Sequence, residues 1–432
     1  MEEIVLKGLE ETIYHDKCEN GLEIYIWVNK KVNTVKGSIT YKIGSEDVEF
    51  KTGKTAHTVP FGTAHFLEHI LCKNSDGTSL LQNFQALGYY ANAATYAYKT
   101  VYEFLGSENL EKAMNLLLDA TQEKEFVEDT FQSEKGPILE EARRNLDNAS
   151  RDIMIELNKM TFKEYPNRMP GVGTIEDIKN ISLEDLKLLY QMFYHPKNSF
   201  VVVTGNVNPR EVIRWIKENQ DKKKFPKYQN PVLKKYREPR KVVETYKEIE
   251  TTLEMPKVFL NVKIPLKNLQ EYDMNTILDA TQVVLSSNFG TTSIFKEELM
   301  SKNLVATLGA YAGFEREYLL LQVVAKTKYP EEVIPLIKQK IYHLEILEKD
   351  IERKKKSEIA NLVLGYEDPE SVNDYISYSI AKFGHIWDNE KETVENLTIE
   401  KITDIISKIS MKEMAILVAK PKTHEKQESS LK

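Results

Sequence analysis

Residues 65–69 read His-Phe-Leu-Glu-His, and this string constrains the chain more than any other segment. In an α-helix, residues three and four positions apart lie on one face. A helix here would therefore present the two histidines and the glutamate together. Leu67, Ile70 and Leu71 have the same spacing and form a separate apolar stripe that can face a core. The segment thus predicts a helix with one face for packing and one face for chemistry.

Two imidazoles and a carboxylate on one face are typical of a catalytic metal site. Neutral imidazole is a good zinc ligand, and a catalytic zinc usually has three protein ligands and a water. We predict that His65 and His69 bind one zinc ion per chain and that Glu68 takes a proton from the bound water. Cys72 falls on the same face and is the candidate fourth ligand of a structural site, although a lone Cys is more often a small buried hydrophobe.

The composition limits the classes of function. A chain of 432 residues favours two or more domains. The formal net charge of −7 argues against nucleic acid as the main partner. Only two cysteines are present, which excludes a disulfide scaffold and indicates a reducing compartment. No apolar run reaches the length of a membrane span and the first residues lack an apolar signal region, so we expect a cytoplasmic protein.

The order of predicted elements suggests two similar halves. Each half begins with strands, continues with helices and closes with a helix followed by an apolar strand, at 199–204 and 414–419. A long helix is predicted from about Pro137 towards Lys163. The basic, Pro-containing segment near the midpoint is typical of a solvated linker, with a patch for an acidic partner as the alternative. The predicted division is a zinc-binding domain at 1–221, a linker at 222–249 and a second, similar domain at 250–432.

At this point the chain resembles the pitrilysin family of zinc peptidases, in the branch that contains mitochondrial processing peptidase and small bacterial relatives. It is also similar to peptidase subunits that mature bacteriocins of the subtilosin type. The resemblance implies an α+β fold of two similar halves, each a mostly antiparallel sheet packed with helices, which enclose a peptide chamber. The matching strings follow one another in the order and spacing of the family: Asn20 to Leu22, Gly62 to His69, Asn92 to Thr95, Glu134 to Glu141 and Tyr194 to Asn198.

The resemblance also implies the remaining site residues. The third zinc ligand of the family is a Glu that follows another characteristic Glu by seven residues, which here are Glu141 and Glu134. Glu141 would bind zinc, and Glu134 would orient the site from behind the ligands. Glu140 is the alternative ligand if the register slips by one residue.

The family resemblance also assigns a substrate-binding strand. Asn92, Ala93, Ala94 and Thr95 resemble an edge strand that receives an extended peptide through main-chain hydrogen bonds. The implied activity is that of a zinc-dependent endopeptidase that hydrolyses peptides or unfolded segments. The alternatives are a non-catalytic scaffold or a peptide-binding subunit of the same fold.

One departure from the family suggests a partner. Many relatives have an Arg and, seven residues later, a Tyr in the second half, which help to bind the substrate. Leu299 and Ala306 stand at these positions here, with Arg316 and Tyr318 as nearby alternatives. The expected enzyme is therefore a heterodimer in which a homologous partner subunit supplies the Arg/Tyr clamp.

Overall fold

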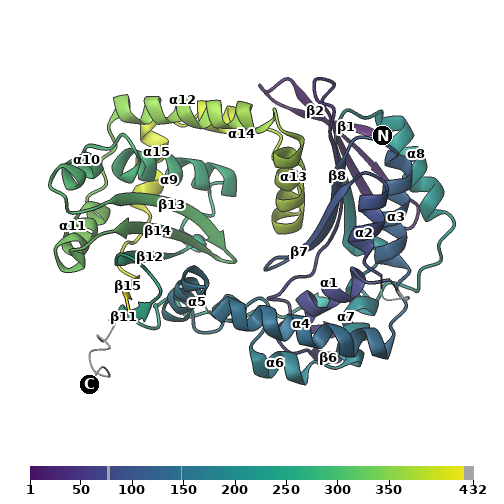
Figure 1. The fold of residues 1–432 in the computed structure, drawn as a ribbon. Coiled ribbons are helices and arrows are strands. Elements are labelled where there is room, and N and C mark those ends of the chain that lie inside the picture. The colour runs from purple at the N-terminus through teal and green to yellow at the C-terminus, as the bar shows by residue number, and fades with distance from the viewer. Residues whose placement is uncertain (75–77, 147, 423–432) are drawn as a thin grey trace, which may run out of the picture. The chain divides into compact units, whose positions relative to one another are not determined.

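The computed structural model describes residues 1–74, 78–146 and 148–422, and the chain forms two compact units (Figure 1). Both units contain segments from both halves of the sequence. Unit 1 comprises Met1–Arg143, Met169–Lys235 and Asn361–Lys391. Unit 2 comprises Arg144–Arg168, Tyr236–Ala360 and the described residues from Glu392 onward. The predicted domains, 1–221 and 250–432, divide the sequence into two continuous halves joined by a linker at 222–249. The two units are defined by packing and combine segments of both halves, so the predicted division stays a prediction.

The core of unit 1 is a seven-stranded sheet. Strands β3 and β9 are parallel, and the other neighbouring pairs are antiparallel. In order across the sheet the strands are β1 (Glu2–Leu6), β2 (Glu11–Lys17), β3 (Glu23–Val28), β9 (Ser199–Gly205), β4 (Val35–Tyr41), β8 (Thr100–Gly106) and β7 (Tyr90–Thr95). A small separate sheet contains β10 (Val232–Leu233), β5 (Glu49–Thr52) and β6 (Thr55–Thr58). Strand β7 is therefore an edge strand of the large sheet.

Both faces of this sheet are covered, because the side chains of its central strands are apolar on both sides. Val201 and Val203 of β9 point into one core, whereas Phe200 and Val202 point into the other. Helix α13 (Pro369–Phe383) packs on the second face. The first face meets the remaining helices of unit 1: α1 (Thr63–Leu71), α2 (Leu80–Ala86), α3 (Leu110–Gln122), α4 (Glu128–Leu146), α6 (Ile175–Asn180), α7 (Leu183–Phe193) and α8 (Pro209–Gln220).

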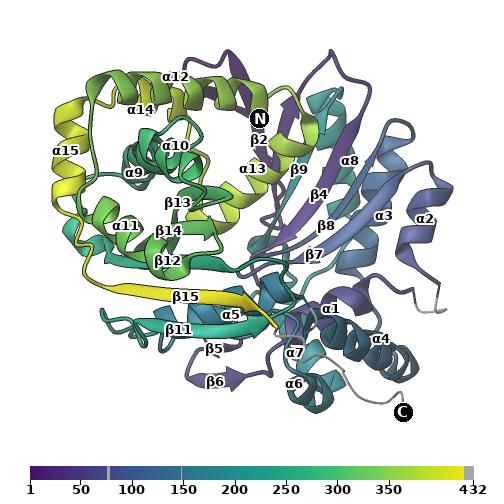
Figure 2. The same ribbon diagram turned by 60° about the vertical axis from the view of Figure 1, so that its left-hand side comes forward.

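The sheet of unit 2 has five strands and repeats the plan of unit 1 (Figure 2). In order they are β11 (Tyr246–Thr251), β15 (Met414–Pro421), β12 (Lys257–Pro265), β14 (Tyr318–Lys326) and β13 (Thr307–Glu315). The first pair is parallel and the others are antiparallel, as in the series β3-β9-β4-β8-β7. The other helices of the second half are α9 (Met274–Phe289), α10 (Ile294–Ser301), α11 (Pro330–Tyr342), α12 (Glu348–Gly365), α14 (Glu390–Glu395) and α15 (Ile399–Ser407).

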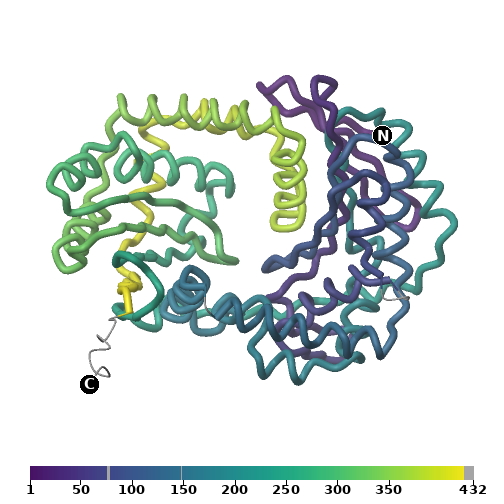
Figure 3. Tube along the Cα trace, in the orientation of Figure 1, coloured from purple at the N-terminus to yellow at the C-terminus, as the bar shows by residue number. Residues whose placement is uncertain are grey.

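Each half of the sequence supplies one helix to the sheet of the other half. Helix α5 (Ala149–Thr161) packs on β12 and β15, where Ile153 and Leu157 contact the cluster that contains Leu417. Helix α13 does the same on β4 and β9 of unit 1, and Figure 3 shows its yellow-green trace beside the purple and blue strands. The predicted α+β class with two similar halves is confirmed.

The single long helix predicted from Pro137 towards Lys163 is wrong. Helix α4 begins at Glu128 and passes through Pro137, because its buried stripe continues on both sides of the proline. Proline inside a helix removes one backbone hydrogen bond, which this packing outweighs. A second helix, α5, starts where the Asn148 side chain accepts hydrogen bonds from two backbone N–H groups and caps the new N-terminus.

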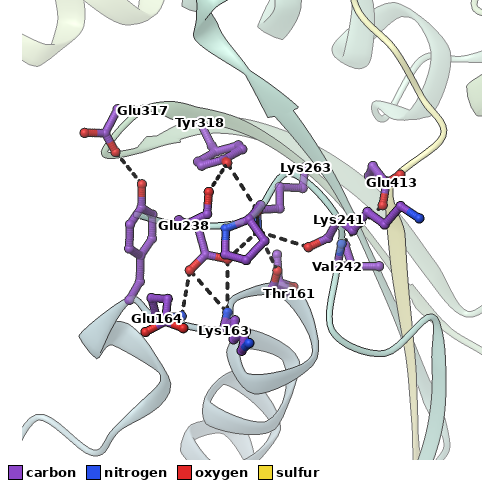
Figure 4. Close-up of polar contacts among 12 residues, drawn as sticks. Thr161, Lys163, Glu164, Glu238, Lys241, Val242, Lys263, Glu317, Tyr318 and Glu413 are labelled. Atoms are coloured by element: carbon purple, nitrogen blue, oxygen red, sulfur yellow. Dashed lines mark hydrogen bonds and ion pairs between the residues drawn. The ribbon is translucent and has the colours of Figure 1, made fainter. Parts of the chain in front are cut away.

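The predicted linker is mostly exposed, but the side chain of Glu238 within it is only 1% exposed and lies in unit 2 (Figure 4). Its carboxylate lies 2.6 Å from the ammonium of Lys263, which is fully buried in β12. The same carboxylate accepts backbone N–H groups of Lys163 and Glu164, just after α5. Lys263 also donates to the carbonyl of Thr161 at 3.0 Å. The ion pair therefore ties the linker, α5 and β12 together.

Replacing Lys263 by Met would leave the Glu238 carboxylate buried without its cation. We expect the free energy of unfolding of unit 2 to fall by about 3–5 kcal/mol, the usual cost of removing one partner of a buried ion pair. Chemical denaturation with a probe in unit 2 measures this change. Lys241→Met, at an exposed lysine of the same segment, is the control and should stay within about 0.5 kcal/mol of the wild type. Equal effects of the two substitutions would contradict the assignment.

Candidate metal centre

The start of helix α1 is fixed by two glycines in close contact. Gly62 precedes the helix with φ of 87°, a left-handed conformation that favours glycine. A Cβ atom on Gly62 would lie 2.4 Å from the carbonyl oxygen of Val172, and one on Gly173 would lie 2.4 Å from that of Phe61. Both positions therefore need glycine, and the close approach sets where α1 begins.

Helix α1 has the two faces that the sequence predicts. Phe66, Leu67 and Ile70 are buried in the core of unit 1. His65 and Glu68 are only 8% and 7% exposed, so the polar face is also largely removed from solvent. The apolar stripe anchors the helix, and this anchoring holds the polar side chains in place.

Helix α4 places Glu141 against both histidines. One carboxylate oxygen, Oε2, lies 3.6 Å from Nε2 of His65 and 3.4 Å from Nε2 of His69. The potential ligand atoms of the three residues all lie within 4.8 Å of one another. In a tetrahedral zinc site with bonds of roughly 2.0–2.2 Å, ligand atoms are about 3.3–3.6 Å apart. The two distances from Glu141 to the histidines match this spacing, so the three residues form a candidate site for one zinc ion. No other such group of three occurs among the described residues.

The neighbouring Glu140 points elsewhere. Its side chain is 63% exposed and pairs with Arg143. Adjacent residues of a helix point about 100° apart, so only one of the two glutamates can face α1. The structure places Glu141 there, and Glu140 on the solvent side.

Glu134 contacts the other nitrogen of His69. Its Oε2 lies 3.5 Å from Nδ1 of His69, and its Oε1 lies 3.0 Å from the ammonium of Lys73. The imidazole of His69 thus has Glu134 on Nδ1 and Glu141 on Nε2. Burial alone would lower the pKa of His69, but the contact with Glu141 and the charge of Glu68 raise it above its ordinary value.

Glu68 is a buried carboxylate held by the edge strand. The hydroxyl of Thr95 donates to its Oε2 at 2.6 Å. Burial raises the pKa of Glu68, although the bond from Thr95 and the charge of His69 oppose this rise. Glu68 is therefore not a member of the candidate metal-binding group formed by His65, His69 and Glu141. The sequence did not reveal Thr95 as the partner of Glu68, because the contact joins residues 27 positions apart.

Cys72 is not a member of the group formed by His65, His69 and Glu141. Burial raises the pKa of its thiol to about 12, which disfavours the thiolate that a metal requires. This geometry gives no support to a closed four-ligand structural site, the alternative that Cys72 would have completed.

The predicted substrate-binding residues Asn92–Thr95 lie in β7, at the free edge of the sheet, where β8 is its only partner among the described strands. Tyr96 donates its N–H to the carbonyl of Lys99, which makes these two residues a hydrogen-bonded pair. Such pairs alternate along antiparallel strands, so the backbone groups of Ala91, Ala93 and Thr95 face away from β8. The edge beside Glu68 therefore presents main-chain donors and acceptors.

Neither of the two predicted clamp positions holds an Arg or a Tyr. Leu299 is buried in α10, and Ala306 lies just before β13. The nearby alternatives are engaged within unit 2. The guanidinium of Arg316 lies 5.4 Å from the ring of Tyr165, and the hydroxyl of Tyr318 donates to the carbonyl of Glu238.

Comparison with known proteins assigns the family. The model of the insulinase family of peptidases, M16, matches residues 48–173, which contain the whole candidate metal centre. The model of the peptidase M16 inactive domain matches residues 180–358. The chain is 30% identical over 417 residues to the uncharacterized zinc protease YmfH of Bacillus subtilis (strain 168), with 93% of this chain and 95% of that protein covered. This chain belongs to peptidase family M16.

Other members of family M16 extend this result. The crystal structure of a putative M16-like peptidase from Alicyclobacillus acidocaldarius has the same fold, with a TM-score of 0.89 at 22% identity over 96% of this chain and 100% of that chain. The putative zinc protease AlbF of Bacillus subtilis is 28% identical over 177 residues, or 41% of each protein. The predicted resemblance to pitrilysin-type peptidases is confirmed. Within the described part of this M16 chain, no helix is long and apolar enough to cross a membrane.

The raised pKa of Glu68 predicts a pH-dependent change in stability for Glu68→Gln. Folded wild type binds the Glu68 proton more strongly than the unfolded chain, so it loses stability as pH rises through the ordinary value of 4.5 towards the raised folded value. Without metal, the variant should therefore be more stable than wild type at pH 7, and the difference should shrink at pH 4. Thermal unfolding in a chelator measures both, with the exposed Glu140→Gln as control. A difference that is the same at both pH values would contradict the prediction.

Proposed function

We propose that this M16 protein is a zinc-dependent endopeptidase that hydrolyses peptides or unfolded segments. The observation that supports this most directly is the combination of three ligand atoms at zinc spacing with a separate buried carboxylate, Glu68, beside them. A structural zinc site normally uses four protein ligands and needs no adjacent base. The group at α1 and α4 has three ligands, which leaves a position for water or substrate.

In the proposed mechanism, His65, His69 and Glu141 hold the zinc ion. A zinc ion held there would supply Lewis acidity towards the attacking water and the scissile carbonyl. Glu68 takes the proton of the attacking water and then gives it to the leaving amine. A raised pKa suits this dual role, because a group that accepts and returns a proton works best with a pKa near the working pH. Thr95 holds Glu68 in position.

The substrate would bind as an extended strand along β7. The outward backbone groups of Ala91, Ala93 and Thr95 can form main-chain hydrogen bonds with a peptide of any sequence. Small side chains at Ala93 and Ala94 leave room for the peptide to approach. Because Thr95 also binds Glu68, a peptide on this edge would lie next to the proposed base.

Substitutions of two adjacent glutamates and of the proposed base test this function. Zinc content is measured by elemental mass spectrometry, and cleavage by mass spectrometry of an unbiased peptide mixture. We expect Glu68→Gln to retain one zinc per chain but to lose hydrolysis by at least about 100-fold. Glu141→Gln should lose zinc and activity together, whereas Glu140→Gln should keep both.

The outcomes separate the alternatives. Comparable turnover by Glu68→Gln would reject Glu68 as the base, and zinc loss in Glu140→Gln would assign the ligand to the neighbouring residue. Glu134→Gln should weaken zinc binding by about 10–100-fold, the usual effect of removing a carboxylate behind a histidine ligand. A wild-type chain that binds no zinc and cleaves nothing would support the non-catalytic scaffold or peptide-binding alternative.

We also propose that the active form is a cytoplasmic heterodimer and that its substrate is a ribosomally made peptide. The need for a partner is supported by the clamp positions, where Leu299 is buried and Ala306 has no polar side-chain group. Arg316 and Tyr318 cannot easily replace a clamp, because both contact other parts of unit 2.

The partner hypothesis predicts weak activity of the isolated, zinc-loaded chain. Adding a homologous subunit that contains the Arg/Tyr pair should raise kcat/KM for the same peptide by at least about tenfold, as expected for one added charged hydrogen bond to the substrate. The control is a partner in which that Arg is replaced by Ala. An isolated chain as active as the complex would disprove the need for a partner.

A further inference from the structure

Lys99 is a buried cation at the end of the β7–β8 hairpin. The residue is 6% exposed, and its ammonium lies 5.1 Å from the centre of the Tyr96 ring. Among the described residues, no carboxylate lies within ion-pair distance of this ammonium, and the Tyr96 ring is its contact. Burial lowers the pKa of Lys99 to about 8.

The two carboxylates whose charges act on Lys99, Glu103 and Asp374, are bound to another lysine. The ammonium of Lys36, also buried, lies 3.0 Å from Glu103 and 2.7 Å from Asp374. Both carboxylates attract Lys99 from a longer distance, and Lys36 repels it. Lys99 therefore interacts with Glu103 and Asp374 only at longer range and forms no ion pair with either one.

A buried ammonium without a paired anion lowers stability, because it gives up its hydration and gains no ion pair. An apolar side chain of similar length would avoid this loss at position 99. Residues that lower stability in this way are commonly found where a protein binds a ligand.

The hairpin places Lys99 beside the proposed peptide-binding edge. Tyr96 and Lys99 are a hydrogen-bonded pair, and residues that oppose each other across a hairpin share one face of the sheet. Thr95 points to the other face, where it meets Glu68. The side chains of a bound peptide alternate in the same way. If one residue of the peptide lies at Glu68, the next residue is directed towards Tyr96 and Lys99.

The turn that carries Lys99 is held firmly. The backbone N–H of Ser45 donates to the carbonyl of Tyr96 at 2.8 Å, and that of Glu46 donates to Ala97 at 2.9 Å. Gly44 allows this contact, because a Cβ there would lie 2.3 Å from the Tyr96 carbonyl oxygen. The position of Lys99 is thus set before any peptide binds.

We propose that Lys99 binds a carboxylate of the peptide at a position next to the scissile bond. The carboxylate would be an acidic side chain or the free C-terminus of the peptide. The inference rests on the proposed function, since it assumes that a peptide adds to the edge of β7. The substrate would therefore carry a negative charge next to the scissile bond, and Lys99 would bind it.

Peptide binding to the Glu68→Gln chain tests the proposal without requiring hydrolysis. A single Glu, or Gln as its neutral control, is moved position by position along an otherwise neutral, labelled peptide with an amidated end. A second set has Gln throughout and a free C-terminus. Fluorescence anisotropy measures Kd for each peptide with zinc-loaded Glu68→Gln and with the same chain also bearing Lys99→Met.

We expect one register in which a carboxylate improves binding about tenfold over its neutral control, the usual size for a charged hydrogen bond. Lys99→Met should remove this preference and leave the Kd of the neutral peptide unchanged. Lys30→Met, an exposed lysine with the same change of charge, should retain the preference. A gain from the internal Glu or from the free C-terminus identifies which carboxylate is bound.

Equal binding of charged and neutral peptides, or a preference that persists in Lys99→Met, would overturn the proposal. The Tm of Lys99→Met should not fall, because the substitution removes an unpaired buried charge, and Lys99→Gln serves as a second variant if it does. Failure of the proposed function has a different signature, which is zinc-loaded wild type that cleaves none of these peptides.

Discussion

The burial of the apolar stripe of α1 is the interaction on which the candidate metal centre depends. Phe66, Leu67 and Ile70 anchor the helix in the core of unit 1, and this anchoring directs His65, Glu68 and His69 to the opposite side. The close contact between two glycine-containing segments fixes where the helix begins. Because a helix is rigid, the position of its buried face decides the position of its polar face. The packing of the apolar face therefore determines the positions of these three polar side chains.

Packing also positions the residues that other elements bring to α1. Helix α4 brings Glu134 and Glu141 to the two nitrogens of His69, since seven residues are close to two helical turns. The edge strand β7 brings Thr95 to Glu68, so that the proposed base and the proposed peptide-binding edge are joined by one hydrogen bond. The core, the candidate zinc ligands, the proposed base and the proposed peptide-binding edge are thus connected within unit 1.

Sequence patterns predicted the local parts of this arrangement well. The helix at residues 65–69 follows from spacing, and the extended strand at residues 92–95 and the pair of glutamates follow from the family resemblance. The sequence prediction was wrong where one local residue preference was outweighed by tertiary packing. Pro137 indicated a helix start, but the buried stripe of α4 extends on both sides of it. The basic segment predicted as a linker is mostly exposed, but the side chain of Glu238 within it is buried against Lys263, a contact that the composition of the segment does not reveal.

The sequence by itself determined which side chains α1 presents together: His65, Glu68 and His69, at helical spacing on one face. It also determined the repeated order of strands and helices. The tertiary structure decided which sheet each helix covers. An amphipathic stripe shows that one face of a helix is buried, but it does not specify which surface covers that face. The sequence of α5 and α13 therefore could not predict that each packs on the sheet formed by the other half of the sequence. It also decided that Lys99 is buried without a paired carboxylate, because burial and pairing depend on neighbours distant in the chain.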